Sequence, residues 1–254
     1  MIQPLLHYND IGMNYHDPSG ETPVLSHFTM RVEAGEFIAI VGPSGCGKST
    51  LLSLAAGLIA PDSGVVLHKG VPITAPPGGV GYMLQKDHLF PWLTIHDNAR
   101  LGLRVRRDET RASGERVDAL LRSTGLWDFK DRFPRQLSGG MRQRAALVRT
   151  LAVQPECLLL DEPFSALDSQ TRVKLSDEVK RTIEEHGCTA LLVTHDISEA
   201  ISMASRVVVL SRRPCVIRRE IPIGIEGTPL ERRDHPHFKE YFHTLWKELD
   251  IHVA

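Results

Sequence analysis

The chain has 254 residues, of which 42% are hydrophobic and 24% charged, so it can bury a substantial core and does not resemble a disordered protein. Its net charge of -1 provides no overall basic field, which argues against a nucleic-acid partner. No apolar run approaches the roughly 18 residues of a membrane span, and MIQPLLHYND lacks the pattern of a secretory signal, so we expect a cytoplasmic protein.

The first third of the chain predicts antiparallel strands. HYNDIGMNY, SHFTMRVEAGE and GVVLHKGVPI are separated by Gly and Pro turns. We expect these segments to form an antiparallel β subdomain at one edge of the core.

GPSGCGKST at residues 42–50 follows the apolar run FIAIV and leads into the helical run LLSLAAGL. Glycines let backbone N–H groups close around phosphate oxygens, Lys48 reaches the outer phosphates, and the Ser49 hydroxyl can ligate Mg²⁺. Cys46 is interpreted as a spacer rather than a nucleophile. This order of strand, loop and helix predicts a nucleotide site with the candidate residues Gly42, Pro43, Ser44, Gly45, Cys46, Gly47, Lys48, Ser49 and Thr50.

From about Asp87 to Arg149 the pattern changes to consecutive helices. DNARLGLRVRR and GERVDALLRSTGL have charged faces, and the segment contains no convincing strand. We interpret residues 87–149, approximately, as an α-helical subdomain inserted into a domain over residues 1–225.

The segment LSGGM at residues 137–141 is a second candidate phosphate-binding loop. Its serine and two glycines precede the helix-forming run MRQRAALVRTLA, so unpaired N–H groups and the positive helix end could face an anion. Because one nucleotide has one triphosphate tail, a second loop raises the question of which nucleotide it serves.

Two carboxylates follow the apolar run CLLL. Asp161 is placed to hold Mg²⁺, directly or through water, and Glu162 to polarise an attacking water. Proton acceptance by such a base is typically worth about 10²- to 10⁴-fold in rate. Similar runs at 37–41, 190–193 and 207–210 are typical of strands buried on both faces, so we predict an α/β core with a largely parallel sheet.

The C-terminal stretch 226–254 predicts an amphipathic helical extension. Its apolar side chains recur at helical spacing at Phe238, Tyr241, Phe242, Leu245, Trp246 and Leu249. Packing onto the chain's own body is favoured over a regulatory or dimerising role, since amphipathicity alone does not say what a helix covers.

In this order, GPSGCGKST, Gln85, LSGGMRQR, LLLDEP, SALD and His195 resemble the nucleotide-binding subunit of an ATP-binding cassette (ABC) transporter. The match extends from about Tyr15 to Leu210. PWLTIHDN and DEPFSALD most resemble the importer group for nitrate, sulfonates, taurine and related small molecules. The resemblance implies a P-loop NTPase (RecA-like) core with an antiparallel β subdomain and an inserted α-helical subdomain.

The resemblance also implies individual roles. Tyr15 matches the aromatic that stacks on adenine, although Tyr8 is nearby and an ordinary strand tyrosine is the alternative. Gln85, ending the strand GYMLQ, matches a residue that contacts Mg²⁺ and water. His195 matches the switch histidine that contacts the γ-phosphate. Asp168 matches a loop that crosses a dimer interface, and its alternative is a helix N-cap.

Ser138, Gly139 and Gly140 would contact the γ-phosphate held by a second copy of the chain, which implies a head-to-tail dimer with two sandwiched ATP molecules. The implied catalytic residues are Lys48, Gln85, Glu162 and His195, and the implied Mg²⁺ ligands are Ser49, Gln85 and Asp161.

An apolar group follows Gln85 in DHLFPWLT, comprising Leu89, Phe90, Trp92 and Leu93. These residues have two interpretations. They form part of a groove that receives a cytoplasmic helix of a membrane partner, or they are buried within the helical subdomain.

The leading hypothesis is an ATPase subunit at the cytoplasmic face of the cell membrane. It would drive two membrane-spanning permease subunits and serve a solute-binding protein indirectly, with no nucleic-acid partner. An importer is favoured by the local motifs and the absence of a fused membrane domain. The alternatives are a soluble ABC ATPase in DNA repair or cluster assembly, and a small-molecule kinase, in which LSGGM and His195 would lack a purpose.

Overall fold

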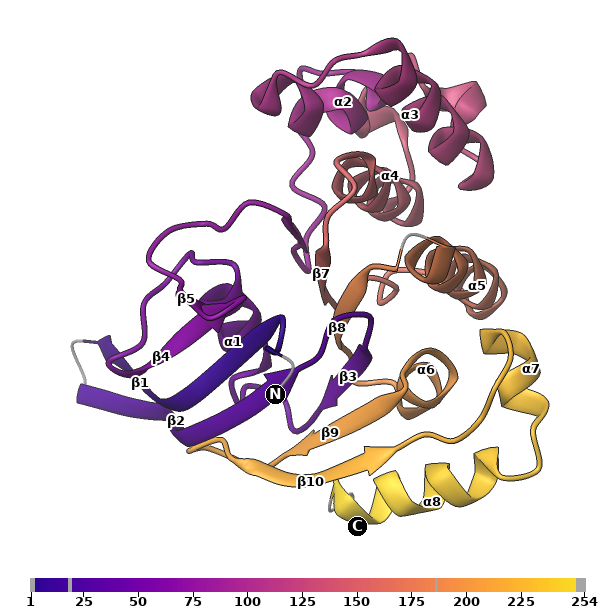
Figure 1. Ribbon diagram of the computed structural model, residues 1–254. Helices are drawn as coiled ribbons and strands as arrows, with labels where there is room; N and C mark the ends of the chain where they lie inside the picture. Colours follow the sequence, from indigo (N-terminus) through magenta and orange to yellow (C-terminus); the bar gives the residue numbers. More distant parts are fainter. Residues whose placement is uncertain (1–2, 18–19, 186, 250–254) are drawn as a thin grey trace.

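The computed structural model describes residues 3–17, 20–185 and 187–249, which form two sheets and the helices packed on them (Figure 1). An antiparallel sheet has the strand order β2-β1-β4-β5 and consists of β1 (Leu6–Asp17), β2 (Gly20–Val32), β4 (Ser63–His68) and β5 (Val71–Pro72). The expected antiparallel strands are therefore present.

The second sheet has the order β10-β9-β3-β8-β7-β6. Its parallel strands are β3 (Phe37–Val41), β6 (Val80–Met83), β7 (Cys157–Asp161), β8 (Thr189–Val193) and β9 (Arg206–Leu210). The antiparallel strand β10 (Ile217–Pro222) pairs with β9 and was not expected from the sequence. Most of its side chains are exposed, so it carries no apolar run.

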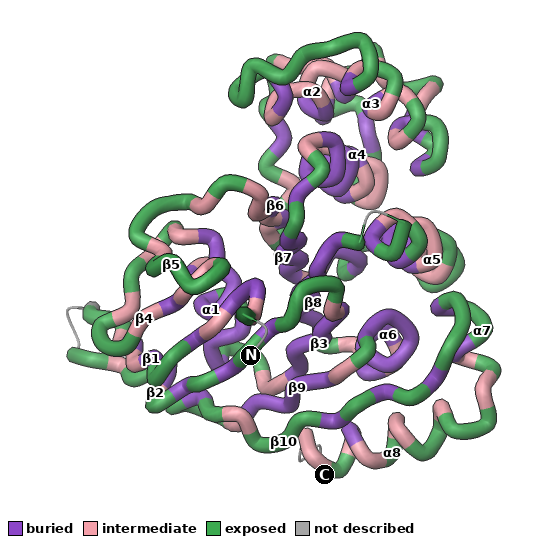
Figure 2. The backbone as a smooth tube through the Cα atoms, viewed as in Figure 1, coloured by how far each residue is buried: buried purple, intermediate pink, exposed green. Residues whose placement is uncertain are grey.

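The parallel strands bury both faces in two different cores. On β3, Ala39 and Val41 belong to the hydrophobic cluster that includes α5, α6 and α8, whereas Ile38 and Ile40 belong to the cluster shared with α1 and the antiparallel sheet. Successive side chains of a strand point to opposite faces, which explains the uninterrupted apolar runs. In Figure 2 the backbone along β7, β8, β3 and β9 is coloured mostly as buried.

Helices cover the second sheet and extend beyond it. The helices around the sheet are α1 (Lys48–Ala55), α5 (Ser169–Glu185), α6 (Ile197–Met203), α7 (Pro229–Asp234) and α8 (Phe238–Glu248). The expected helical segment contains α2 (Ile95–Arg106), α3 (Arg111–Ser123), α4 (Gly139–Ala152) and the short 3₁₀ helices η1 (Trp127–Phe129) and η2 (Pro134–Gln136). Figure 1 shows α2, α3 and α4 grouped beyond β7, away from the antiparallel sheet. None of the helices that the structure describes is long and apolar enough to cross a bilayer.

The amphipathic helix α8 packs on the chain's own body, as expected. Leu245 is fully buried, and the other five apolar positions of the pattern are partly buried against the same core. Ion pairs from Arg218 and Arg219 of β10 to Glu248 add polar contacts at the end of the helix. Residues 250–254 of the expected extension lie outside the described residues.

Candidate functional site

The loop between β3 and α1 has the backbone of a phosphate-binding loop. Gly45 and Gly47 have φ values of 74° and 123°, a region that side chains disfavour, and a Cβ on Gly47 would stand 2.8 Å from Val24 Cγ1. The Lys48 Nζ donates to the carbonyl oxygens of Gly42 at 2.8 Å and Pro43 at 2.9 Å. The ammonium is therefore held against the loop that would surround an anion.

A polar cavity of about 340 Å³ opens beside this loop. It is lined by Ser44, Gly45, Gly47, Lys48, Ser49, Thr50, Gln85, Glu162, Val193 and Arg213. Cys46 is not among the lining residues, because its side chain is buried in the core, as a spacer would be. The cavity therefore joins the loop to residues that lie far away in the sequence.

Asp161 ends β7 directly beside the phosphate-binding loop. Its side chain is only 5% exposed, and burial raises its pKa, while a hydrogen bond with Ser49 and the charge of Lys48 act in the opposite direction. The Asp161 carboxylate and the Ser49 hydroxyl thus lie in contact at the carboxyl edge of the sheet. Both groups offer oxygen atoms, the ligands that Mg²⁺ prefers.

Glu162 follows with a φ of 48°, a strained conformation for a residue other than glycine. Its Oε2 accepts a hydrogen bond from Gln85 Nε2 at 3.2 Å, and its Oε1 lies 3.4 Å from His195 Nδ1. The structure therefore brings the three predicted side chains together. One detail of the prediction was wrong: β6 ends at Met83, so Gln85 lies in the loop beyond the strand.

The two tyrosines of β1 have different environments. The Tyr15 hydroxyl lies 3.0 Å from Thr50 Oγ1, at the first turn of α1, and Tyr15 is 44% exposed. Tyr8 is fully buried and donates to the carbonyl of Leu51 at 2.9 Å. Of these two tyrosines, Tyr15 is the accessible one beside the loop.

The second glycine-rich loop does not reach the cavity of Lys48. Ser138 caps α4 by accepting a hydrogen bond from Met141 N at 3.3 Å, and Gly139 lines a separate cavity of about 430 Å³. Asp168 accepts a hydrogen bond from Thr171 N at 3.0 Å, so it caps the start of α5, and this bond lowers its pKa. Within one chain, these predicted residues stand apart from the first loop.

The sequence model described as "ABC transporter" matches residues 25–165, more than half of the chain. The chain belongs to the ABC transporter family. It is 45% identical over 248 residues to the ABC transporter ATP-binding protein YtlC of Bacillus subtilis, covering 96% of this chain and 95% of that protein. This family is a family of ATPases, so the chain is an ATP-binding, ATP-hydrolysing cassette.

Two further relatives have names that mention a solute. The chain is 39% identical to the nitrate import ATP-binding protein NrtD of Synechocystis sp., over 93% of this chain and 91% of that protein. It is 36% identical to the taurine import ATP-binding protein TauB of Roseobacter denitrificans, over 95% of this chain and 94% of that protein.

Solved structures agree with the expected P-loop NTPase fold. The dimeric post-hydrolysis structure of the ATP-binding cassette MJ0796 bound to ADP and Pi has a TM-score of 0.79 and 30% identity, covering 87% of this chain and all of that one. The fold class expected from the sequence is therefore confirmed.

The ABC cassette contains a link near His195 that the sequence did not reveal. Arg172 donates to Asp196 Oδ2 at 2.9 Å and to the carbonyl of Leu167 at 3.1 Å. It thereby joins the loop that contains Asp168 to the segment after His195. Leu167 belongs to SALD, but Arg172 and Asp196 stand in no recognisable motif, and their contact depends on how α5 packs beside α6.

A buried carboxyl group lies one helical turn beyond His195. Glu199 is 3% exposed, and burial raises its pKa to about 7, while a hydrogen bond with Thr194 opposes the shift and nearby Asp196 adds to it. Arg172 and His195 also act against the shift. We therefore expect Glu199 to change its charge near neutral pH, one helical turn beyond His195.

We expect the cassette to become less stable as pH rises, because Glu199 must lose its proton in a buried site. We expect Glu199→Gln to abolish this pH dependence. Between its usual 4.5 and the folded pKa of about 7, the folded state binds more protons than the unfolded state, so stability falls across this window. The shift of the Glu199 pKa from 4.5 to about 7 corresponds to a loss of about 3 kcal/mol in the free energy of unfolding. Urea unfolding at pH 5 and pH 8 measures the difference for both proteins.

The matched control is Glu185→Gln on the exposed surface of α5, where the side chain is 63% exposed. This control should keep the pH dependence of the original protein. If Glu199→Gln also keeps it, the titration of Glu199 does not destabilise the fold.

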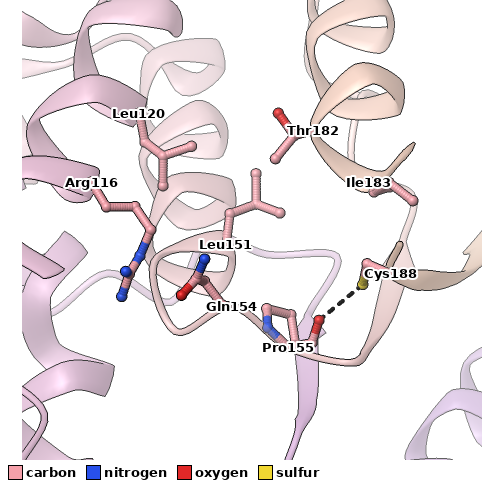
Figure 3. A pocket seen from close by; sticks show the side chains of 8 residues that line it. All are labelled: Arg116, Leu120, Leu151, Gln154, Pro155, Thr182, Ile183 and Cys188. Carbon is pink, nitrogen blue, oxygen red and sulfur yellow. Dashed lines mark hydrogen bonds between the residues drawn. The ribbon is translucent and has the colours of Figure 1, made fainter. Parts of the chain in front are cut away.

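A small apolar cavity lies between the helical segment and α5 (Figure 3). Its volume is about 40 Å³, and its lining combines Leu120 of α3 and Leu151 of α4 with Ile183 of α5. Cys188 donates to the carbonyl of Pro155 at 3.0 Å along one wall. The side chains of α3, α4 and α5 therefore leave a small gap at this point of an otherwise shared hydrophobic cluster.

Proposed function

We propose that this ABC ATPase drives a membrane importer for a small solute of the nitrate, sulfonate or taurine kind. It acts at the cytoplasmic face of the membrane as a head-to-tail dimer. The names of NrtD and TauB support the importer and the class of solute. One domain over residues 1–225, with the helical subdomain at about 87–149, forms the cassette, and residues 226–254 form an extension on it.

The separation of the two glycine-rich loops carries the dimer proposal. Ser138, Gly139 and Gly140 do not line the cavity that contains Lys48. Ser138 nevertheless stands at the start of a helix of 14 residues, where backbone N–H groups and the helix dipole favour an anion. A second copy brings this helix end to the nucleotide of the first, and the dimeric form of MJ0796 supports such an assembly.

The residues around the cavity divide the work of hydrolysis. The loop of residues 42–50 and Lys48 hold the phosphates, and Tyr15 stacks on adenine. Glu162 accepts a proton from the attacking water, while Gln85 and His195 orient its carboxylate. This division makes Glu162 the group on which the rate depends most.

Ser49, Asp161 and Gln85 fit Mg²⁺. They supply a hydroxyl, a carboxylate and an amide oxygen beside the phosphate loop, a donor set suited to a hard cation that keeps phosphate ligands. When bound there, the ion would neutralise charge on the phosphate oxygens.

The apolar residues after Gln85 had two interpretations, burial within the protein and contact with a membrane partner, and different residues of the group fit each one. Leu89 is 8% exposed and belongs to the hydrophobic cluster that α2, α3 and α4 share with the second sheet, whereas Phe90 is 38% and Trp92 68% exposed. The two exposed rings lie 5.1 Å apart. Buried Asn98 fixes their loop, since its side-chain amide donates to the carbonyls of Phe90, Leu93 and Thr94.

We propose that Phe90 and Trp92 contact a cytoplasmic helix of the permease. A rigid loop that exposes a pair of aromatic rings has the chemistry of an interface anchor, because such rings bury much apolar area with little loss of conformational entropy. ATP-driven closure of the dimer would then move the permease through this contact.

Isolation of the tagged chain from native membranes tests this function. We expect two hydrophobic permease subunits to copurify with it, and Trp92→Ala to lose them, because an aromatic anchor is commonly worth about 2 kcal/mol or more. Val105→Ala is the control, since Val105 is 77% exposed in the same subdomain. A strictly soluble complex without hydrophobic subunits would contradict the importer and favour a soluble ABC ATPase. The solute is then identified by the loaded binding protein that stimulates ATP hydrolysis.

A further inference from the structure

Arg213 lies in the turn between β9 and β10, against the phosphate loop. Its Nε donates to the carbonyl oxygen of Gly45, and its Nη2 lies 3.4 Å from the position that a Cβ of Gly45 would occupy. Arg213 also lines the cavity of about 340 Å³ together with Lys48 and Thr50. A second cation therefore reaches the nucleotide cavity from a segment that no phosphate motif covers.

The turn that carries Arg213 is anchored on both sides. The Cys215 backbone donates to the carbonyl of Val24 on β2 at 2.7 Å, and the Ser211 backbone donates to the carbonyl of Val216 at 3.0 Å. Cys215 itself is fully buried. The backbone on either side of Arg213 is thus held in place, although the Arg213 side chain is exposed.

The guanidinium has unused donors. Across residues 3–17, 20–185 and 187–249, no carboxylate forms an ion pair with Arg213, and its only recorded hydrogen bond leaves from Nε. An exposed guanidinium at the edge of a polar cavity is available to pair with an anion that enters the cavity. The nucleotide phosphates are the anions that this cavity receives.

We propose that Arg213 is a phosphate-binding residue of the ATP site. Its Nε stays on the Gly45 carbonyl and fixes the plane of the guanidinium, while the two Nη groups donate to phosphate oxygens. Such a fork matches phosphate better than a single ammonium does. The inference rests on ATP binding by the cassette and is independent of the importer and of its solute.

Nucleotide affinity of the purified full chain tests Arg213. We expect Arg213→Ala to raise the Kd and KM for ATP about 10-fold, the typical effect of one charge-assisted hydrogen bond, with kcat changed less than about 2-fold. The effect should shrink at high salt, because charge contacts near solvent are screened. The neighbouring Arg212→Ala is the matched control, since Arg212 is exposed in the same turn and does not line the cavity.

Two replacements separate a phosphate contact from support of the loop. Arg213→Gln keeps an N–H donor for the Gly45 carbonyl but carries no charge, so it should bind ATP as weakly as the alanine variant, while Arg213→Lys should recover part of the affinity. Wild-type affinity in Arg213→Gln, or a loss that does not depend on salt, would overturn the proposal. If Lys48→Ala also binds ATP normally, the nucleotide site itself has been misplaced, which distinguishes that failure from the failure of Arg213 alone.

Discussion

Replacing Glu162 by Gln should stop ATP hydrolysis and leave ATP binding intact. An amide has nearly the shape of the carboxylate, so the loop and its Lys48 keep their positions, but it cannot accept a proton from water. The expected loss in kcat is about 10²- to 10⁴-fold, the usual contribution of a general base. Gln85 and His195, which contact the two carboxylate oxygens, would no longer orient a base.

The ATP that is not hydrolysed should then hold two copies of the chain together. Phosphate release measures the chemistry, equilibrium dialysis measures binding, and size-exclusion chromatography at saturating ATP and Mg²⁺ measures the dimer. Glu226→Gln is the control, because Glu226 is an exposed carboxylate far along the chain from the site. A Glu162→Gln protein that stays monomeric under these conditions would count against Glu162 as the base.

Mixing two variants that each fail to form an ATP-bound dimer should give a mixed dimer with one intact ATP site. Lys48→Ala removes the cation of the first loop, and Ser138→Arg places a bulky cation at the helix start that we assign to the partner's nucleotide. Each variant alone carries a lesion in both sites of its dimer. In a mixed dimer, one site combines the intact Lys48 of one chain with the intact Ser138 of the other, while the remaining site carries both lesions.

Differently tagged chains in the Glu162→Gln background make this measurable. We expect ATP-dependent capture of one chain by the other, with one nucleotide retained per mixed dimer and no capture between identical variants. Ser123→Arg on the exposed surface of α3 is the control for the added arginine, and this variant should still close on itself with two nucleotides. If the Lys48→Ala and Ser138→Arg chains fail to bind one another, the assignment of Ser138 to the partner's site is wrong.

Strands that are buried on both faces were the easiest part of the fold to predict. The runs at 37–41 and 190–193 are uninterrupted because each strand supplies side chains to two cores. The strand β10 was missed for the opposite reason, since most of its side chains face solvent and only its pairing with β9 makes it a strand. Gln85 was placed at a strand end because sequence patterns locate the middle of an element better than its boundary.

The structure was needed to tell which apolar residues after Gln85, and which of the two tyrosines of β1, are exposed. Trp92 and Leu89 are both apolar and three positions apart, and only the packing of the folded chain buries Leu89 and exposes Trp92. Tyr8 and Tyr15 lie on the same strand, and burial against α1 leaves only Tyr15 accessible.

The sequence by itself determined the family, the α/β core and the set of motif residues, because phosphate-binding loops and buried strands depend on local spacing and on contiguous apolar runs. The tertiary structure decided which side chains meet. Arg213 contacts Gly45 across 168 positions and Arg172 contacts Asp196 across 24, and neither contact leaves a periodic signal in the chain. Such contacts arise only when separate elements pack together, so the second cation at the phosphate loop and the link behind His195 became visible only in the folded protein.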